Sequence, residues 1–195
     1  MNPFDRETLL FLNGLAGRSD LLDAVMRIVV GDYLVAVLGV VTLVGLWFAG
    51  KTPAERERMQ VTLLAGAASV GLANLAVTTI NSIWARPRPF VAMPESVKLL
   101  FYPSTDPSFP ANPIAVAFAI AGAVWLINRR LGTSLIALAA VQAVARVYAG
   151  VAYPTDTIGG AVVGLLALTG AIGLRRLIRP IPEMTIRLAR AFLLA

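Results

Sequence analysis

Two arginines, Arg88 and Arg146, are the residues of this chain with the clearest capacity for binding chemistry. A guanidinium group presents its N–H donors in a planar fork that matches the oxygens of a phosphate. Both arginines lie in polar stretches of an otherwise apolar chain, at residues 81–90 and 145–156, and a third polar stretch spans residues 106–113. If the three stretches meet, the arginines predict a site for an anionic headgroup.

A structural role is the alternative for each of these residues. An arginine near the membrane interior is costly and usually finds a polar partner, so Arg146 could simply pair with Asp156 across the intervening turn. Asp156 could instead cap the helix that follows it. Prolines end helices and arginines mark membrane interfaces, which explains the Arg86-Pro-Arg88-Pro sequence equally well. We favour the headgroup site because Arg88, Arg146 and the loop containing Ser108 would share one face.

The composition indicates an integral membrane protein. Hydrophobic residues make up 57% of the 195 residues and charged residues only 14%, whereas an ordinary soluble domain is roughly 45–50% apolar. The chain has no cysteine and no histidine, so a zinc site would need carboxylates alone, and we expect no metal and no cofactor. The net charge of +6 is spread over short loops, which argues against nucleic acid as a partner.

Five segments have the length and apolarity of membrane-spanning helices, which need roughly 17–25 such residues. They are residues 33–49, 60–80, 109–127, 134–151 and 158–174. Their glycines and alanines suit close packing of helices within a membrane. The sequence thus predicts an all-α polytopic bundle that forms a single domain over residues 1–195.

The two ends of the chain are predicted to differ from the spans. In residues 1–31, glycines and the charged Asp23 and Arg27 interrupt the apolar run. This favours an interfacial or re-entrant segment, with a sixth span as the alternative. Residues 181–195 place arginines beside large apolar side chains, as an amphipathic helix on the membrane surface would.

Basic residues predict the orientation of the bundle, because cytoplasmic loops are enriched in lysine and arginine. Such residues follow the first, third and fifth predicted spans: Lys51, Arg56, Arg58, Arg129, Arg130, Arg175, Arg176 and Arg179. The three polar stretches then lie at the opposite, outer face of the membrane.

Short motifs within the polar stretches resemble those of a known family. The sequences Arg-Pro-Arg-Pro-Phe at 86–90, Asp-Pro-Ser-Phe-Pro at 106–110 and Ala-Arg-Val-Tyr-Ala-Gly at 145–150 are similar, in order and spacing, to the three motifs of the type 2 phosphatidic acid phosphatase (PAP2) superfamily. Residues 11–17 and 21–26 resemble its bacterial undecaprenyl-diphosphatase branch. The resemblance implies the PAP2 fold, a phosphorylated lipid as ligand and a location in the bacterial cytoplasmic (inner) membrane.

The first two motifs match the family only in part. Arg88 matches an arginine that binds phosphate in this family, but Asn81 stands at the position of the phosphate-binding lysine. The second motif of the family is Pro-Ser-Gly-His, whose histidine protonates the leaving oxygen. Here Ala111, Asn112 and Pro113 replace the serine, the glycine and the histidine.

The third motif lacks the residue that acts as nucleophile in the family. Arg146 matches a phosphate-binding arginine, and Asp156 matches the acid that orients the nucleophilic histidine. Ala152 stands at the position of that histidine, and Ala145 at that of a serine. In-line attack needs a nucleophile and departure needs a proton donor, which alanine and proline do not supply. The resemblance therefore implies phosphate binding without the usual means of hydrolysis.

Three functions stay open on the sequence. The favoured hypothesis is a catalytically inactive PAP2-like protein that binds a polyprenyl phosphate or a phospholipid and presents, senses or transports it. The residues predicted to contact the headgroup are Arg88, Arg146, Asn81, Ser108, Asn112 and Asp156. The second is a structural subunit that packs against a membrane-protein partner or another copy of itself. The third is an active undecaprenyl-diphosphatase or phosphatidic acid phosphatase with an unusual nucleophile, such as Asp106 or Asp156, although no metal-binding partner supports it.

Overall fold

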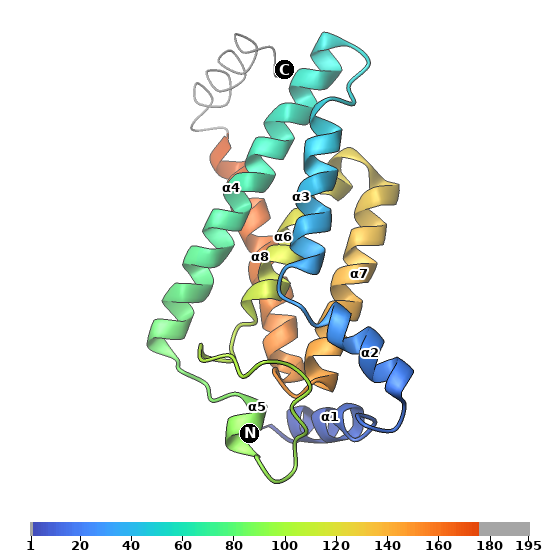
Figure 1. Cartoon of the computed structure of the whole chain (residues 1–195). Coiled ribbons are helices and arrows are strands. Elements are labelled where there is room, and N and C mark those ends of the chain that lie inside the picture. Colours follow the sequence, from blue (N-terminus) through green and yellow to red (C-terminus); the bar gives the residue numbers. More distant parts are fainter. Residues whose placement is uncertain (1, 176–195) are drawn as a thin grey trace.

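The computed structural model describes residues 2–175, and all regular elements in that range are helices (Figure 1). These are α1 (Pro3–Asn13), α2 (Asp20–Val29), α3 (Leu34–Trp47), α4 (Pro53–Ile83), α5 (Pro89–Ala92), α6 (Asn112–Ile127), α7 (Arg129–Tyr148) and α8 (Pro154–Arg175). The helix predicted at residues 181–195 lies outside the described residues, as do Arg176 and Arg179.

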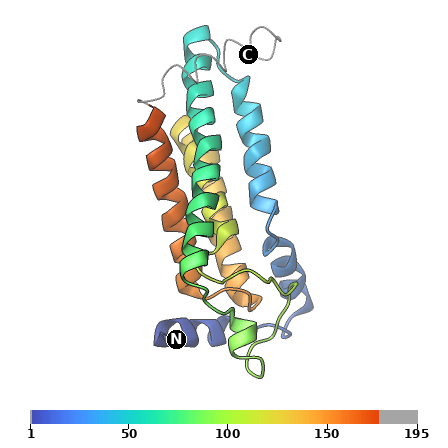
Figure 2. The same cartoon turned by 90° about the vertical axis from the view of Figure 1, so that its left-hand side faces the viewer.

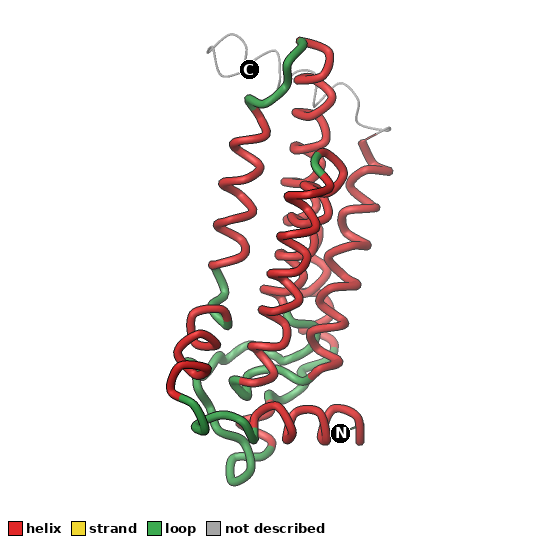
Figure 3. The backbone as a smooth tube through the Cα atoms, turned by 90° about the vertical axis from the view of Figure 1, so that its right-hand side faces the viewer, coloured by secondary structure: helices red, strands yellow, loops and turns green. Residues whose placement is uncertain are grey.

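The five longest helices, α3, α4, α6, α7 and α8, run lengthwise beside one another, and α1 lies across one end of them (Figures 1 and 2). The short α5 and the long loop that follows it lie at the same end, where most of the loop structure gathers (Figure 3). We call this the site end of the bundle. The α3–α4 and α6–α7 connections lie at the opposite end.

Three helices, α4, α7 and α8, are long and apolar enough to cross a membrane. The pair α2 and α3, bent by 52° at the break between them, forms a broken span or a re-entrant loop, which brings the candidates to four among the described residues. The remaining bundle helix, α6, is apolar but has only 16 residues. The protein is therefore an integral membrane protein whose residues 2–175 are all-helical and contain three to four candidate spans, fewer than the five predicted.

Several predicted span boundaries differ from the helix ends; for example, α4 begins at Pro53, so Arg56 and Arg58, predicted to lie between spans, are part of it. Residues 109–111 belong to a loop, so α6 begins only at Asn112. Arg129 and Arg130 were predicted to lie between spans, but they open α7, whose N-terminus is capped by the Asn128 side chain accepting the N–H of Leu131. A capped helix start satisfies a donor that would otherwise be unpaired, so α7 begins before its apolar run does.

Residues 2–31 contain two short helices, α1 and α2, and neither is long enough to span a membrane by itself. Asp23 does not pair with Arg27 here. Its carboxylate accepts the N–H of Gly17 at 3.0 Å and the hydroxyl of Tyr148, which attaches α2 to the end of α7. A buried carboxylate needs such partners, because desolvation of an unpaired charge is costly.

The central helix of the bundle is α6, which packs against α3, α4, α7 and α8. Six of its 16 residues are alanine or glycine, and of these Ala115, Ala119 and Ala121 are fully buried. Small side chains let helix backbones approach closely, which replaces the hydrophobic driving force that is missing between helices in lipid. The close packing around α6 fixes the relative positions of the helices that end at the site.

The turn between α7 and α8 depends on Gly150, whose φ of 75° lies in the left-handed region. A Cβ atom at this position would lie 2.6 Å from Val97 Cγ1 and 2.8 Å from the carbonyl oxygen of Lys98. Glycine therefore allows the turn to pack directly against the loop after α5. This packing holds the end of α7 and the start of α8 at the site end.

Gly164 of α8 contacts the backbone of α6, where a Cβ atom would lie 2.2 Å from the carbonyl oxygen of Ala115. We expect Gly164→Ala to push the helices apart and to lower the free energy of unfolding by about 1–3 kcal/mol, as overpacking does. Thermal unfolding in detergent measures this loss. Gly170→Ala is the control, because a Cβ atom there meets nothing within 4 Å. Equal midpoints for the two variants would contradict the prediction.

Candidate functional site

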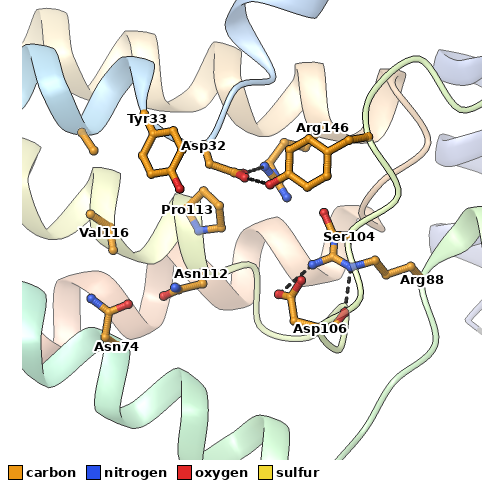
Figure 4. Close-up of a pocket in the computed structure, with 12 residues that line it drawn as sticks. Asp32, Tyr33, Asn74, Arg88, Ser104, Asp106, Asn112, Pro113, Val116 and Arg146 are labelled. Carbon is orange, nitrogen blue, oxygen red and sulfur yellow. Dashed lines mark hydrogen bonds and ion pairs between the residues drawn. The ribbon is translucent and has the colours of Figure 1, made fainter.

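A polar cavity of about 300 Å³ lies at the site end, between α3, α4, α6, α7 and the loop after α5 (Figure 4). Nine of its twelve lining residues are polar or charged: Asp32, Tyr33, Asn74, Arg88, Tyr102, Ser104, Asp106, Asn112 and Arg146. Apolar contacts come from Ala36, Pro113 and Val116. The cavity therefore brings together residues of all three polar stretches: Arg88 from the first, Asp106, Asn112 and Pro113 from the second, and Arg146 from the third.

Arg88 and Arg146 both line this cavity, and both side chains are buried, with exposed fractions of 5% and 1%. The Nη2 atom of Arg88 lies 2.9 Å from Asp106 Oδ2, and its Nη1 donates to the carbonyl of Val151 at 2.8 Å. The Nη1 atom of Arg146 lies 2.6 Å from Asp32 Oδ1. The two guanidinium groups can therefore act on one ligand, each with a carboxylate beside it.

The structural alternative in which Arg146 pairs with Asp156 is not found, because Arg146 pairs with Asp32. Asp156 pairs instead with Arg86, whose Nη1 lies 2.6 Å from Asp156 Oδ1. The other carboxylate oxygen accepts the hydroxyl of Ser108 and, at 2.9 Å, the N–H of Tyr153 directly before α8. This last bond caps α8, the other structural alternative for Asp156, in the arrangement in which a side chain in the first turn reaches back to the N–H that precedes the helix.

Arg86 also binds Asp5 of α1, with 2.7 Å between Nη2 and Asp5 Oδ2. Thr155 donates its N–H and its hydroxyl to the same carboxylate, at 2.9 and 2.7 Å. Burial opposes ionisation of Asp5, but the bonds from Arg86 and Thr155 outweigh burial and hold the pKa of Asp5 below its usual value. The group of Asp5, Arg86 and Asp156 ties α1 to the start of α8, and we call it the Arg86 cluster.

The other predicted site residues divide between these two places. Asn112 lines the cavity, whereas Asp156 belongs to the Arg86 cluster and accepts the hydroxyl of Ser108, and Asn81 belongs to neither place. The Oδ1 atoms of Asn81 and Asn112 are buried and have no hydrogen-bond partner among the described residues. Of the four positions where catalytic-motif residues are replaced, Pro113 lines the cavity, and the other three are buried: Ala111, Ala145 and Ala152.

Asp32 and Tyr102 are cavity residues that the sequence did not identify. Asp32 lies at the break between α2 and α3 and binds Arg146, while the hydroxyl of Tyr102 donates to its second oxygen. The hydrogen bond to Asp32, together with burial, raises the pKa of Tyr102. The one feature of the sequence that could have identified Asp32 is its position directly before a long apolar run. An unpaired charge is unfavourable there, so a partner could have been expected.

The fold and the cavity define a class: a helical membrane protein whose buried arginines share a polar cavity at one end of its bundle. Comparison of the sequence with known families narrows this class to one family. Residues 62–178 match the family model described as the PAP2 superfamily, and the chain belongs to this family of membrane lipid phosphatases. The resemblance seen in the motifs is thereby confirmed.

Related proteins agree with this assignment. The chain is 27% identical over 183 residues to undecaprenyl-diphosphatase BcrC of Bacillus subtilis (strain 168), covering 93% of this chain and 90% of the relative. Its fold is similar to that of LpxE from Aquifex aeolicus, with a TM-score of 0.70, 23% identity and coverage of 88% and 96% of the two chains. A phosphatidylglycerolphosphate phosphatase from Bacillus subtilis matches with a TM-score of 0.64 and 20% identity, over 91% and 89%.

The Arg86 cluster predicts a loss of stability in Asp5→Asn, because this change leaves Arg86 with one carboxylate partner. We expect the free energy of unfolding to fall by about 1.5–3 kcal/mol, the usual contribution of a hydrogen bond to a charged group. Thermal or denaturant unfolding in detergent measures this. Glu7→Gln, at an exposed position of the same helix, is the control and should leave stability unchanged.

The size of that loss should depend on pH. The pKa of Asp5 is lower in the folded protein than in the unfolded chain, so its ionised form stabilises the fold above the unfolded pKa of about 3.9. This contribution is lost as the pH falls through the folded pKa. The stability difference between the parent and Asp5→Asn should be full near neutral pH and shrink below about pH 4. A difference that grew on acidification would show that the pairing is not electrostatic.

Proposed function

We propose that this protein binds a phosphorylated lipid, a phospholipid or a polyprenyl phosphate, in the cavity at the site end and does not hydrolyse it. The main support is that Arg88 and Arg146, from separate elements, line one cavity. Guanidinium groups held in a half-enclosed site at the end of a membrane bundle match a lipid phosphate in charge and in geometry. Relatives are named as phosphatases of phosphorylated lipids, which supports the same class of ligand.

The absence of hydrolysis is inferred from the residues at two positions of the motifs. Pro113 lines the cavity where the family places its proton donor, and Ala152 is fully buried where the family places its nucleophile. The 195 residues contain no histidine that could replace either. General acid–base catalysis alone contributes roughly 10²- to 10⁴-fold, so a site without these groups is expected to bind far better than it cleaves.

A ligand phosphate can reach Arg88 because the aspartate beside it is accessible. The Asp106 side chain is 53% exposed and lies on a loop, and ion pairs open to solvent contribute only about 0–1 kcal/mol. A phosphate oxygen can therefore take its place at the guanidinium group. Ala36, Pro113 and Val116 supply an apolar wall against which the first part of a lipid chain can pack.

Hydrolysis is the second candidate, favoured by the activity named for BcrC. The carboxylates that could attack a phosphate in the cavity are Asp32 and Asp106, since Asp156 is enclosed in the Arg86 cluster. An enzyme of this kind would form an aspartyl-phosphate, which water must then cleave. Loss of phosphate release in Asp106→Asn would identify this mechanism.

The first test compares the parent with the double variant Arg88→Gln/Arg146→Gln. We expect native mass spectrometry to find a phosphorylated lipid on the parent alone, because glutamine is uncharged and cannot pair with phosphate. Phosphate release from undecaprenyl diphosphate should be no greater for the parent than for the double variant. Arg18→Ala, at an exposed loop position, is the control, and thermal unfolding separates loss of ligand from loss of fold. Equal lipid retention by all three proteins would reject the site.

We also propose that α3 and α6 cross the membrane with the three longer helices, giving five spans with the site end at the outer face of the bacterial cytoplasmic membrane. The support is the position of Lys51, Arg129 and Arg130 near the opposite end of the bundle, since basic residues favour the cytoplasmic side.

This orientation can be tested with single cysteines, because the chain has none of its own. Glu95→Cys at the site end should react with a membrane-impermeant maleimide added to intact spheroplasts, and Lys51→Cys should react only after the membrane is opened. Both positions are exposed, so the difference reports on sidedness alone. The reverse pattern would place the site end in the cytoplasm.

A further inference from the structure

The charged residues that line the cavity are balanced in number. Two guanidinium groups, of Arg88 and Arg146, stand beside two carboxylates, of Asp106 and Asp32, at 2.9 and 2.6 Å. Their formal charges add up to zero before any ligand enters. A site that recognised phosphate alone would be expected to present excess positive charge, as electrostatic complementarity requires.

A ligand that carries only phosphate disturbs this balance. A phosphate monoester has a charge of about −1.5 to −2 near neutral pH, and it would compete with Asp106 for the guanidinium group of Arg88. Asp106 would then lose its partner and stand beside added negative charge. A ligand that also carries an ammonium group avoids this repulsion, because the ammonium group gives the displaced carboxylate a new partner.

The two kinds of charge lie at different depths. The arginine side chains are almost fully buried, whereas the aspartates that pair with them are more exposed, at 53% for Asp106 and 17% for Asp32. Cations therefore line the inner part of the site and anions the outer part. Tyr33 and Tyr102 are exposed residues of the same lining, and aromatic rings attract ammonium groups.

We propose that the cavity recognises a zwitterionic lipid headgroup, a phosphate diester ending in a primary ammonium group. Its phosphate binds Arg88 and Arg146, and its ammonium group takes the outer position beside Asp106 (Figure 4). This inference rests on the proposed lipid binding and narrows its ligand class, leaving lipids with a bare phosphate as weaker ligands.

The test is a competition among phosphatidylethanolamine, phosphatidic acid and phosphatidylglycerol with identical acyl chains, read by native mass spectrometry of the full-length protein. We expect the parent to retain phosphatidylethanolamine over phosphatidic acid by up to about fivefold, the most that one partly exposed charge pair can supply. Asp106→Asn should reverse this preference, because it frees Arg88 for an anionic lipid and removes the partner of the ammonium group. Glu95→Gln, an exposed position of the same loop, should behave as the parent.

Two results would overturn the inference while leaving lipid binding intact. The parent could retain phosphatidic acid as strongly as phosphatidylethanolamine, or Asp106→Asn could leave their ratio unchanged, with both lipids lost in Arg88→Gln/Arg146→Gln. Retention that is equal in the parent and that double variant would overturn the proposed function as well. Excess glycerophosphoethanolamine, which lacks acyl chains, identifies the source of the headgroup: displacement of the lipid points to a soluble ligand of the same chemistry, and continued lipid retention points to the membrane lipid itself.

Discussion

Charge pairing of arginines controls how the site end of this bundle is assembled. An uncompensated charge in a buried position destabilises a protein by several kcal/mol, and three arginine side chains here are largely withdrawn from solvent. Each is paired with aspartates from other parts of the chain: Arg86 with Asp5 and Asp156, Arg88 with Asp106, and Arg146 with Asp32. These pairs hold the N-terminal helices and the loop after α5 against α7 and α8. The polar end of the molecule is thus organised by charge, while the rest is organised by the packing of small residues around α6.

The ion pairs differ in how far they are buried. This difference distinguishes the pair that has a structural role from the pair that a ligand can open. Asp156 is fully buried and is held by Arg86, Ser108 and the backbone of Tyr153, so nothing in the cavity competes for it. Asp106 is exposed and has a single ion-pair partner. A pair with one exposed member exchanges readily with a ligand, because solvent already weakens it. The Arg86 cluster therefore keeps the site in shape, and the two arginines of the cavity remain available to a ligand.

Hydropathy predicted the bundle helices well because apolarity along a helix is a local property that a membrane imposes directly. Hydropathy failed where an apolar side chain packs within a loop. Phe109 was assigned to a span, but it lies in a loop and packs on Trp84, with 4.9 Å between the ring centroids. The motifs led to the two cavity arginines, Arg88 and Arg146. They did not reveal Asp5 and Asp32 as ion-pair partners, because both lie outside the motifs, and no local pattern indicates which distant carboxylate an arginine will meet.

The presence of arginines at motif positions does not by itself argue for a ligand, because an arginine can be kept in place by structure alone. Arg86 illustrates this, since its partners enclose it and it does not line the cavity. Arg88 has a structural contact too, through the carbonyl of Val151. The residues at the family's histidine positions are equally compatible with the fold: Pro113 lies in the first turn of α6, where proline is favoured, and Ala152 fills a fully buried position. Arg88 and Arg146 differ from Arg86 in that both line a cavity. The aspartates paired with them, Asp106 and Asp32, line the same cavity and are more exposed than the arginines. Binding is therefore inferred from the cavity next to the charges, and its selectivity from the aspartates that balance them.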